Sequence, residues 1–155
     1  MGRDIKSEIL KNIRTARRSH VQWVDRAKSL VHGLKITKDQ NPLKVTTCEF
    51  GTWFYCDGQI LLSIFKEDAV KALEDKHTEL HDVYMKIFKI YFDTSNCSLW
   101  SKLMKKRKRV SKTEEAAAII HLKELEEVSN ALVSFLNIIE KKITSIEEAK
   151  FEQFL

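Results

Sequence analysis

The sequence predicts an all-α protein: an antiparallel helical bundle of four main helices plus a short helix that carries a cysteine. Apolar side chains recur at spacings of three and four residues over long stretches, which is the pattern of helices with one buried face. The 155 residues include one proline and four glycines, so there is little material for turns. No stretch alternates apolar and polar residues for long enough to indicate a strand.

The composition indicates a single domain over residues 1–155. Apolar residues make up 43% and charged residues 32% of the chain, and its length suits one buried core. There is no run of about 18 uncharged apolar residues that could span a membrane. The first ten residues, MGRDIKSEIL, are charged throughout, unlike a secretion signal. We therefore expect a cytoplasmic protein without membrane insertion.

The net charge of +5 is concentrated in one block, KKRKR at residues 105–109. Such a block can contact phosphates. It has no interleaved aromatic residues and no DNA-binding motif accompanies it. A solvated loop between helices is the more common explanation, so we expect no nucleic-acid partner.

The first half of the chain is predicted to contain one long and one short helix. The long helix covers residue 4 to about residue 33, where Gly33 favours a stop. Pro42 then indicates a loop, because it forces the preceding residue out of helical geometry. Thr46 or Thr47 can cap the short helix that follows.

The second half is predicted to contain two further long helices. One runs from about residue 59 to 93, and its first residues can form a separate turn. The sequence DTSNCS interrupts the pattern at residues 93–98. The last helix is predicted at about 113–150, with a buried stripe of Ala117, Ile120, Leu125, Val128, Leu132, Phe135, Leu136, Ile139 and Ile143.

A pair of histidines in the second long helix is a candidate for metal binding. His77 and His81 are four residues apart, so both imidazoles face the same side and can reach one ion. Two structural histidines, solvated or buried, are the ordinary alternative. Glu79 lies second between them, whereas the zinc-protease pattern HExxH places glutamate directly after the first histidine. The pair thus lacks a hydrolytic base, and we expect no enzymatic activity.

Two further residues qualify as ligands. His20 lies on the inward side of the first helix, three residues before Trp23, although by itself a hydrogen-bonded core or boundary histidine is the better interpretation. Cys48 lies at the predicted start of the short helix, where backbone N–H groups stabilise a thiolate; otherwise it is a small buried apolar residue. Gly51 permits close approach of a neighbouring helix or of the metal site, and Trp53 is large enough to shield it. Three imidazoles and one thiolate would complete a tetrahedral Zn²⁺ shell without a water position.

The spacing of these residues forms a longer pattern. His20 is followed after two residues by Trp23, then after 24 residues by CEFGTW at 48–53, and after 23 more by the pair His77 and His81. This arrangement resembles the bacterial chemoreceptor zinc-binding (CZB) domain. The signature of that family is a histidine followed by an aromatic residue, a Cys-x-apolar-Gly-x-aromatic element and an HxxxH pair.

The resemblance covers about residues 10–93 and implies a helical bundle that binds one Zn²⁺. The implied ligands are His20, Cys48, His77 and His81, and the implied packing residues are Trp23, Phe50, Gly51 and Trp53. Domains of this family occur in cytoplasmic chemoreceptors and diguanylate cyclases. Some form homodimers, and some are associated with sensing hypochlorous acid or other oxidants. We expect a homodimeric regulator in chemotaxis or cyclic-di-GMP type signalling. The sequence shows no signalling hairpin or cyclase domain, so a separate partner, or zinc binding itself, would be the output.

Cys48 is the redox-sensitive residue of this hypothesis. Three cysteines, an odd number, argue against a disulfide framework and favour metal or redox chemistry. Oxidation of a zinc-bound thiolate removes a charged ligand from the metal, and movement of the short helix could transmit that change. Cys56 could act as a resolving thiol, although an incidental cysteine is the better interpretation. Cys97 is assigned no role.

Two functions of other classes remain as alternatives. A hemerythrin-like di-iron oxygen-binding protein is suggested by five histidines and two HxxxxD pairs, which begin at His20 and His77. It needs bridging carboxylates and an HxxxE element that neither His32 nor His121 supplies, and it leaves Cys48 unexplained. The other alternative is a metal-free helical adaptor that docks through its last helix.

Overall fold

The computed structural model describes residues 2–34, 44–92 and 109–155. Three long helices dominate: α1 (Gly2–Val31), α4 (Glu67–Tyr91) and α6 (Lys112–Ser145). Between α1 and α4 lie α2 (Glu49–Phe54), the 3₁₀ turn η2 (Asp57–Ile60) and α3 (Leu61–Ile64). After α6 come α7 (Glu148–Phe151) and η3 (Glu152–Phe154). The described residues contain no strand, which confirms the all-α prediction.

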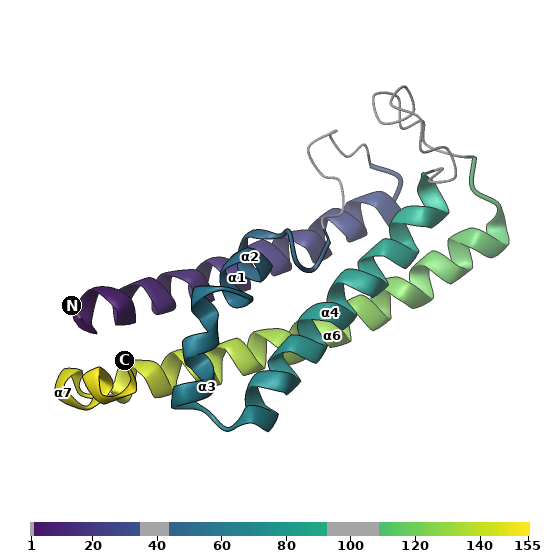
Figure 1. Ribbon diagram of the computed structural model, residues 1–155. Helices are drawn as coiled ribbons and strands as arrows, with labels where there is room; N and C mark the ends of the chain where they lie inside the picture. The colour runs from purple at the N-terminus through teal and green to yellow at the C-terminus, as the bar shows by residue number, and fades with distance from the viewer. Residues whose placement is uncertain (1, 35–43, 93–108) are drawn as a thin grey trace.

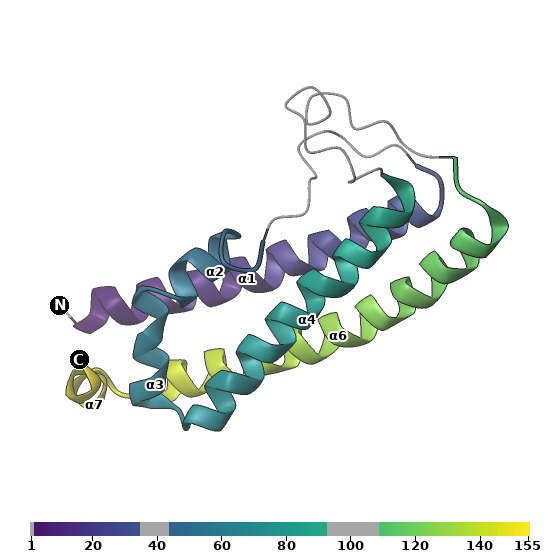
Figure 2. The same ribbon diagram turned by 45° about the vertical axis from the view of Figure 1, so that its right-hand side comes forward.

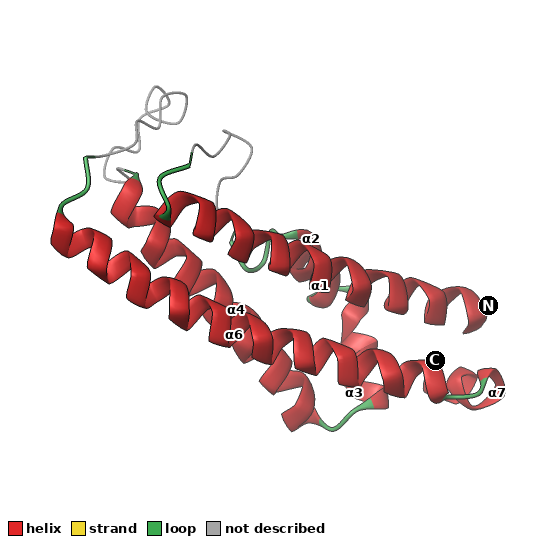
Figure 3. Cartoon of the chain, turned by 180° about the vertical axis from the view of Figure 1, so that it is seen from behind, coloured by secondary structure: helices red, strands yellow, loops and turns green. Residues whose placement is uncertain are grey.

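The long helices form a three-helix arrangement with the short elements on one side. Helices α1 and α4 run in the same direction, and α6 runs opposite to both (Figure 1). Helix α6 packs along both of them, whereas α1 and α4 contact one another much less. Helix α2 lies against α1, and α3 contacts α4 and leads to its start (Figure 2). Both chain ends lie at the same end of the bundle (Figure 3).

The predicted number of four main helices is not confirmed in the part of the chain that the structure describes. The helix predicted over 59–93 begins at Glu67, because Phe65 and Lys66 have extended backbone angles. The separate turn expected before it is the segment formed by η2 and α3. Since α1 and α4 are parallel, the bundle is antiparallel only with respect to α6.

Two helix ends are explained by local hydrogen bonds. Gly33 has a positive φ of 82°, and the N–H groups of Gly33 and Leu34 bond back to the carbonyls of Leu30 and Ser29. This is a Schellman motif, which ends α1 close to the predicted position. Helix α6 begins after Ser111, whose side chain is part of a capping box.

The last helix differs from its prediction in two respects. It ends at Ser145 rather than near residue 150, because Ile146 adopts an extended conformation before α7. Ile120 is 67% exposed, and Leu122 is buried instead. At 100° per residue, Ile120 lies about 140° around the helix from the buried Leu125, so it cannot share that face.

Candidate metal centre

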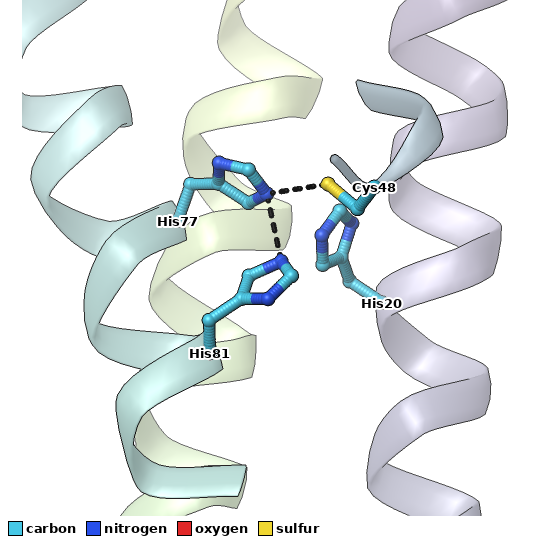
Figure 4. A group of neighbouring side chains, drawn as sticks. All are labelled: His20, Cys48, His77 and His81. Carbon is cyan, nitrogen blue, oxygen red and sulfur yellow. Dashed lines mark hydrogen bonds between the residues drawn. The ribbon is translucent and has the colours of Figure 1, made fainter. Parts of the chain in front are cut away.

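Four side chains that are distant in sequence meet in the space between α1 and α4. His20 comes from α1, Cys48 from the residue before α2, and His77 and His81 from α4 (Figure 4). Their ligand atoms all lie within 4.8 Å of one another, and all four residues are buried. The structure thus brings together all four residues that the sequence pattern suggested as ligands.

Two distances between ligand atoms are close to those of a tetrahedral ion. His77 Nε2 lies 3.1 Å from His81 Nε2 and 3.3 Å from Cys48 Sγ. In a tetrahedral zinc site with the usual bond lengths of about 2.0–2.3 Å, neighbouring ligand atoms are roughly 3.3–3.6 Å apart. The i, i+4 spacing on α4 therefore places both imidazoles at ligand separation, as their sequence spacing predicted.

A backbone hydrogen bond orients His20. Its Nδ1 lies 2.6 Å from the carbonyl oxygen of Ala16, one helical turn earlier. A carbonyl oxygen can only accept, so Nδ1 carries the proton and Nε2 keeps a free lone pair. Metal-binding histidines commonly have this arrangement, with the second nitrogen donating to a backbone carbonyl. His20 is thus held in the tautomer that a ligand needs.

Cys48 is the N-cap residue of α2, a role that the sequence analysis assigned to Thr46 or Thr47. The Gly51 N–H donates to Cys48 Sγ at 3.2 Å, so the sulfur takes the place of the usual cap oxygen. Thr47 Oγ1 donates instead to the Lys44 carbonyl. The assignment changes because the turn at residues 45–47 precedes the helix and Cys48 is the last residue before it.

Burial, not the helix terminus, dominates the protonation of Cys48. Loss of solvation raises the pKa of the Cys48 thiol, and the hydrogen bond from Gly51 offsets this only in part. The backbone N–H groups at the helix start therefore favour the thiolate, as expected, but burial outweighs them in the metal-free chain. A bound cation would have to displace the thiol proton, which makes metal binding dependent on pH.

Gly51 allows the chain before α2 to approach the helix closely. A Cβ atom at this position would overlap the Val45 carbonyl oxygen and would lie 3.3 Å from Cys48 Sγ. The close approach expected from the glycine is thus made by the turn that precedes Cys48. This packing holds the sulfur against the first turn of α2.

Aromatic rings enclose the cluster from the α2 side. The ring of Phe50 stands edge-on to His77, with 4.9 Å between centroids, and also contacts His20. Trp53 packs on Phe50 at 5.8 Å, and the ring contacts in the described residues do not join it to a histidine. Trp53 therefore shields the cluster through Phe50.

Trp23, on α1, packs on His81. The two ring centroids are 4.6 Å apart, and Tyr84 also packs on Trp23, at 4.7 Å. Burial raises the pKa of Tyr84 to about 12. The sequence analysis did not identify Tyr84, although its position seven residues after His77 places it on the same helix face.

Burial keeps His20 and His77 of the cluster neutral before any ion binds. Burial lowers the pKa of His20 to about 4 and that of His77 to about 2, with the neighbouring histidines adding to the effect. Neutral imidazoles keep the lone pairs that a metal requires. His77 Nδ1 is buried without a hydrogen-bond partner among the described residues. A set of nitrogen and sulfur donors at these distances is suited to a thiophilic divalent cation such as Zn²⁺.

The other titratable candidates lie elsewhere. Asp25 and Asp82, which the di-iron alternative requires, are exposed, as is His32. His121 lies on α6, where Nδ1 pairs with Glu124. No carboxylate belongs to the ligand cluster found in the described residues, so that structure gives no support to a di-iron centre.

The two remaining cysteines and the basic block lie only partly within the described residues. Cys56 is a free, exposed thiol. Cys97 and residues 105–108 lie outside the described residues. The described helices include none that is both long and apolar enough to cross a membrane.

Comparison with known families gives one match. Residues 20–88 match the model of the chemoreceptor zinc-binding domain, so the matched region begins at His20 and contains all four cluster residues. The chain resembles this domain, as its sequence pattern predicted. Neither the curated proteins nor the solved structures provide a match.

Proposed function

We propose that this chain, which resembles the chemoreceptor zinc-binding domain over residues 20–88, is a cytosolic zinc-binding regulatory protein without enzymatic activity. His20, Cys48, His77 and His81 are its ligands. The observation that supports this most strongly is the convergence of four buried donor groups from three separate segments. Chance rarely buries three histidines around one thiol, because each buried polar group needs a partner.

The donor set favours a closed regulatory site over a catalytic one. Three imidazoles and one thiolate satisfy a tetrahedral Zn²⁺, whereas catalytic zinc sites keep one position for water or substrate. The cation would supply a bond between α1, the start of α2 and α4. Because α1 and α4 contact one another only sparsely, a bound Zn²⁺ would hold these two helices at their present distance.

Cys48 makes the site responsive to oxidants as well as to zinc. Its thiolate is the one anionic ligand of the set, and oxidation to a sulfenic acid would remove it from the metal. Since Cys48 also caps α2, its loss would release the helix start. We propose that this movement alters a homodimer interface or the surface offered to a chemoreceptor, cyclase or other signalling partner.

The first test is elemental analysis of the purified chain from metal-replete medium. We expect about one Zn²⁺ per chain, a severe loss in His77→Ala and His81→Ala, and a smaller loss in Cys48→Ala, which would also lack any response to hypochlorite. His121→Ala is the matched control, since this histidine pairs with Glu124 on α6 and should leave the zinc content unchanged.

The same measurement distinguishes the alternatives. Two iron atoms per chain, with a visible absorption band, would support the oxygen-binding alternative. Absence of any metal from the folded chain, purified from metal-replete medium, would support the helical adaptor. Equal zinc content in all variants, including the control, would contradict the ligand assignment.

A further inference from the structure

A cavity of about 150 Å³ opens between α1 and α2 beside the metal centre. Two of the four ligand residues, His20 and Cys48, line it. The polar residues that line it are Ser19, Gln22, Arg26 and Glu49. A cavity of this size with polar walls has room for several waters. It therefore joins the otherwise buried cluster to solvent on one side.

The α4 ligands lie away from this cavity. His77 is fully buried, and neither it nor His81 belongs to the cavity lining. Phe50 stands against His77, while Trp23 covers His81. An ion or reagent that comes through the cavity would thus meet His20 and Cys48 first and the α4 pair last.

We propose that this cavity is the entrance of the metal centre, through which zinc and small hydrophilic chelators or thiol reagents reach Cys48 without unfolding of α2. The part of the proposal that concerns zinc entry rests on the proposed function. The part that concerns access of small reagents to the Cys48 thiol does not. The proposal gives Ser19 and Gln22 a role. Neither residue hydrogen-bonds to a ligand residue in the described part of the structure. These residues set the width of the entrance.

The test measures alkylation of Cys48 in the metal-free protein. Cys56→Ser and Cys97→Ser leave Cys48 as the one thiol, and mass spectrometry follows its reaction with iodoacetamide. Ser19→Trp places an indole in the entrance. Ser134→Trp is the matched control, because Ser134 is an exposed serine on α6 and lies outside the cavity lining. We expect Ser19→Trp to slow alkylation at least tenfold and Ser134→Trp to leave the rate unchanged.

Equal rates in the two variants would overturn the proposal. So would a rate in the unplugged protein that rises steeply in urea below the unfolding transition, because access would then require local opening of α2. Circular dichroism checks that both variants fold. If Ser19→Trp loses helix content, Gln22→Trp serves as the second plug and is judged by the same comparison.

A second measurement separates this proposal from the proposed function. In the zinc-loaded protein, the plugged variant should transfer zinc to a chromogenic chelator at least tenfold more slowly while its zinc content stays unchanged. Absence of zinc from every preparation would contradict the proposed function, and the alkylation rates would then test the entrance by themselves. Normal zinc content with equal transfer rates in both tryptophan variants would contradict the entrance but not the proposed function.

Discussion

Replacing Gly51 with alanine should weaken zinc binding, although Gly51 donates no ligand. The added Cβ would overlap the Val45 carbonyl oxygen, and it would lie 2.9 Å from the carbonyl carbon of the same residue and 3.3 Å from Cys48 Sγ. The atoms of Val45 are backbone atoms, so they cannot give way by a change of rotamer. The turn at 44–48 must move away from α2 instead.

The expected loss of zinc affinity follows from the hydrogen bonding of the turn at 44–48. The Cys48 N–H donates to the Lys44 carbonyl at 3.0 Å, so displacement of Val45 also moves Cys48 relative to His77. Inserting a methyl group into a tightly packed site costs about 1–3 kcal/mol. If the zinc-bound state requires the turn in its present place, this whole cost appears as lost affinity, roughly 5- to 150-fold.

The assay is competition for zinc against a chelator of known affinity, with urea unfolding of the metal-free variants in parallel. Gly33→Ala is the control. Its Cβ would meet no atom within 4 Å, but its φ of 82° is strained for alanine, so it should lose about 1 kcal/mol of stability without loss of zinc affinity. Zinc affinity of Gly51→Ala within twofold of the wild-type value would refute the packing argument, as would an equal loss in Gly33→Ala.

Two further predictions concern protonation and the attachment of α2. The pKa of His20 is about 4 and that of His77 about 2 in the folded chain, against about 6.5 when unfolded, so below pH 6.5 the unfolded state binds more protons. The metal-free protein should therefore lose about 2 kcal/mol per histidine between pH 7.5 and 5, measured by urea unfolding at both pH values; an unchanged midpoint would contradict the neutral imidazoles. Tyr55 lies at the end of α2, and partial burial together with neighbouring Glu74 of α4 raises its pKa to about 12. Tyr55→Phe should release zinc several-fold faster, and an unchanged release rate would show that the Tyr55 hydroxyl does not help to hold α2 in place.

Much of the helical structure follows from local features of the sequence. The apolar spacing predicts α1, α4 and α6 because each buries one face, and Gly33 stops α1 through a hydrogen-bonded motif that needs its positive φ. The prediction was wrong where tertiary packing decides. Ile120 was included in the buried stripe of the last helix because it is apolar, but the path of α6 along its neighbours leaves it exposed.

The four ligand candidates differ in how far the sequence alone predicts them. His77 and His81 follow from helical spacing alone, because neighbours four residues apart share a face. His20 and Cys48 needed the family pattern, since nothing local distinguishes them from a core histidine and a buried thiol. The role of Cys48 as the cap of α2 was missed, because threonine is the usual cap residue and the preceding turn was not predicted.

The sequence by itself determined the helical class, the positions of the long helices and a candidate ligand set, because these depend on side-chain spacing and residue type over a few turns. Tertiary structure decided that α1 and α4 run parallel on α6, that α2 packs against α1, and that His20 and His77 are neutral. The physical reason is distance along the chain. His20 and Cys48 are 28 residues apart, and Cys48 and His77 are 29 apart, so only the packing of the long helices and of the short helix against them can bring these residues within ligand distance and remove water from them.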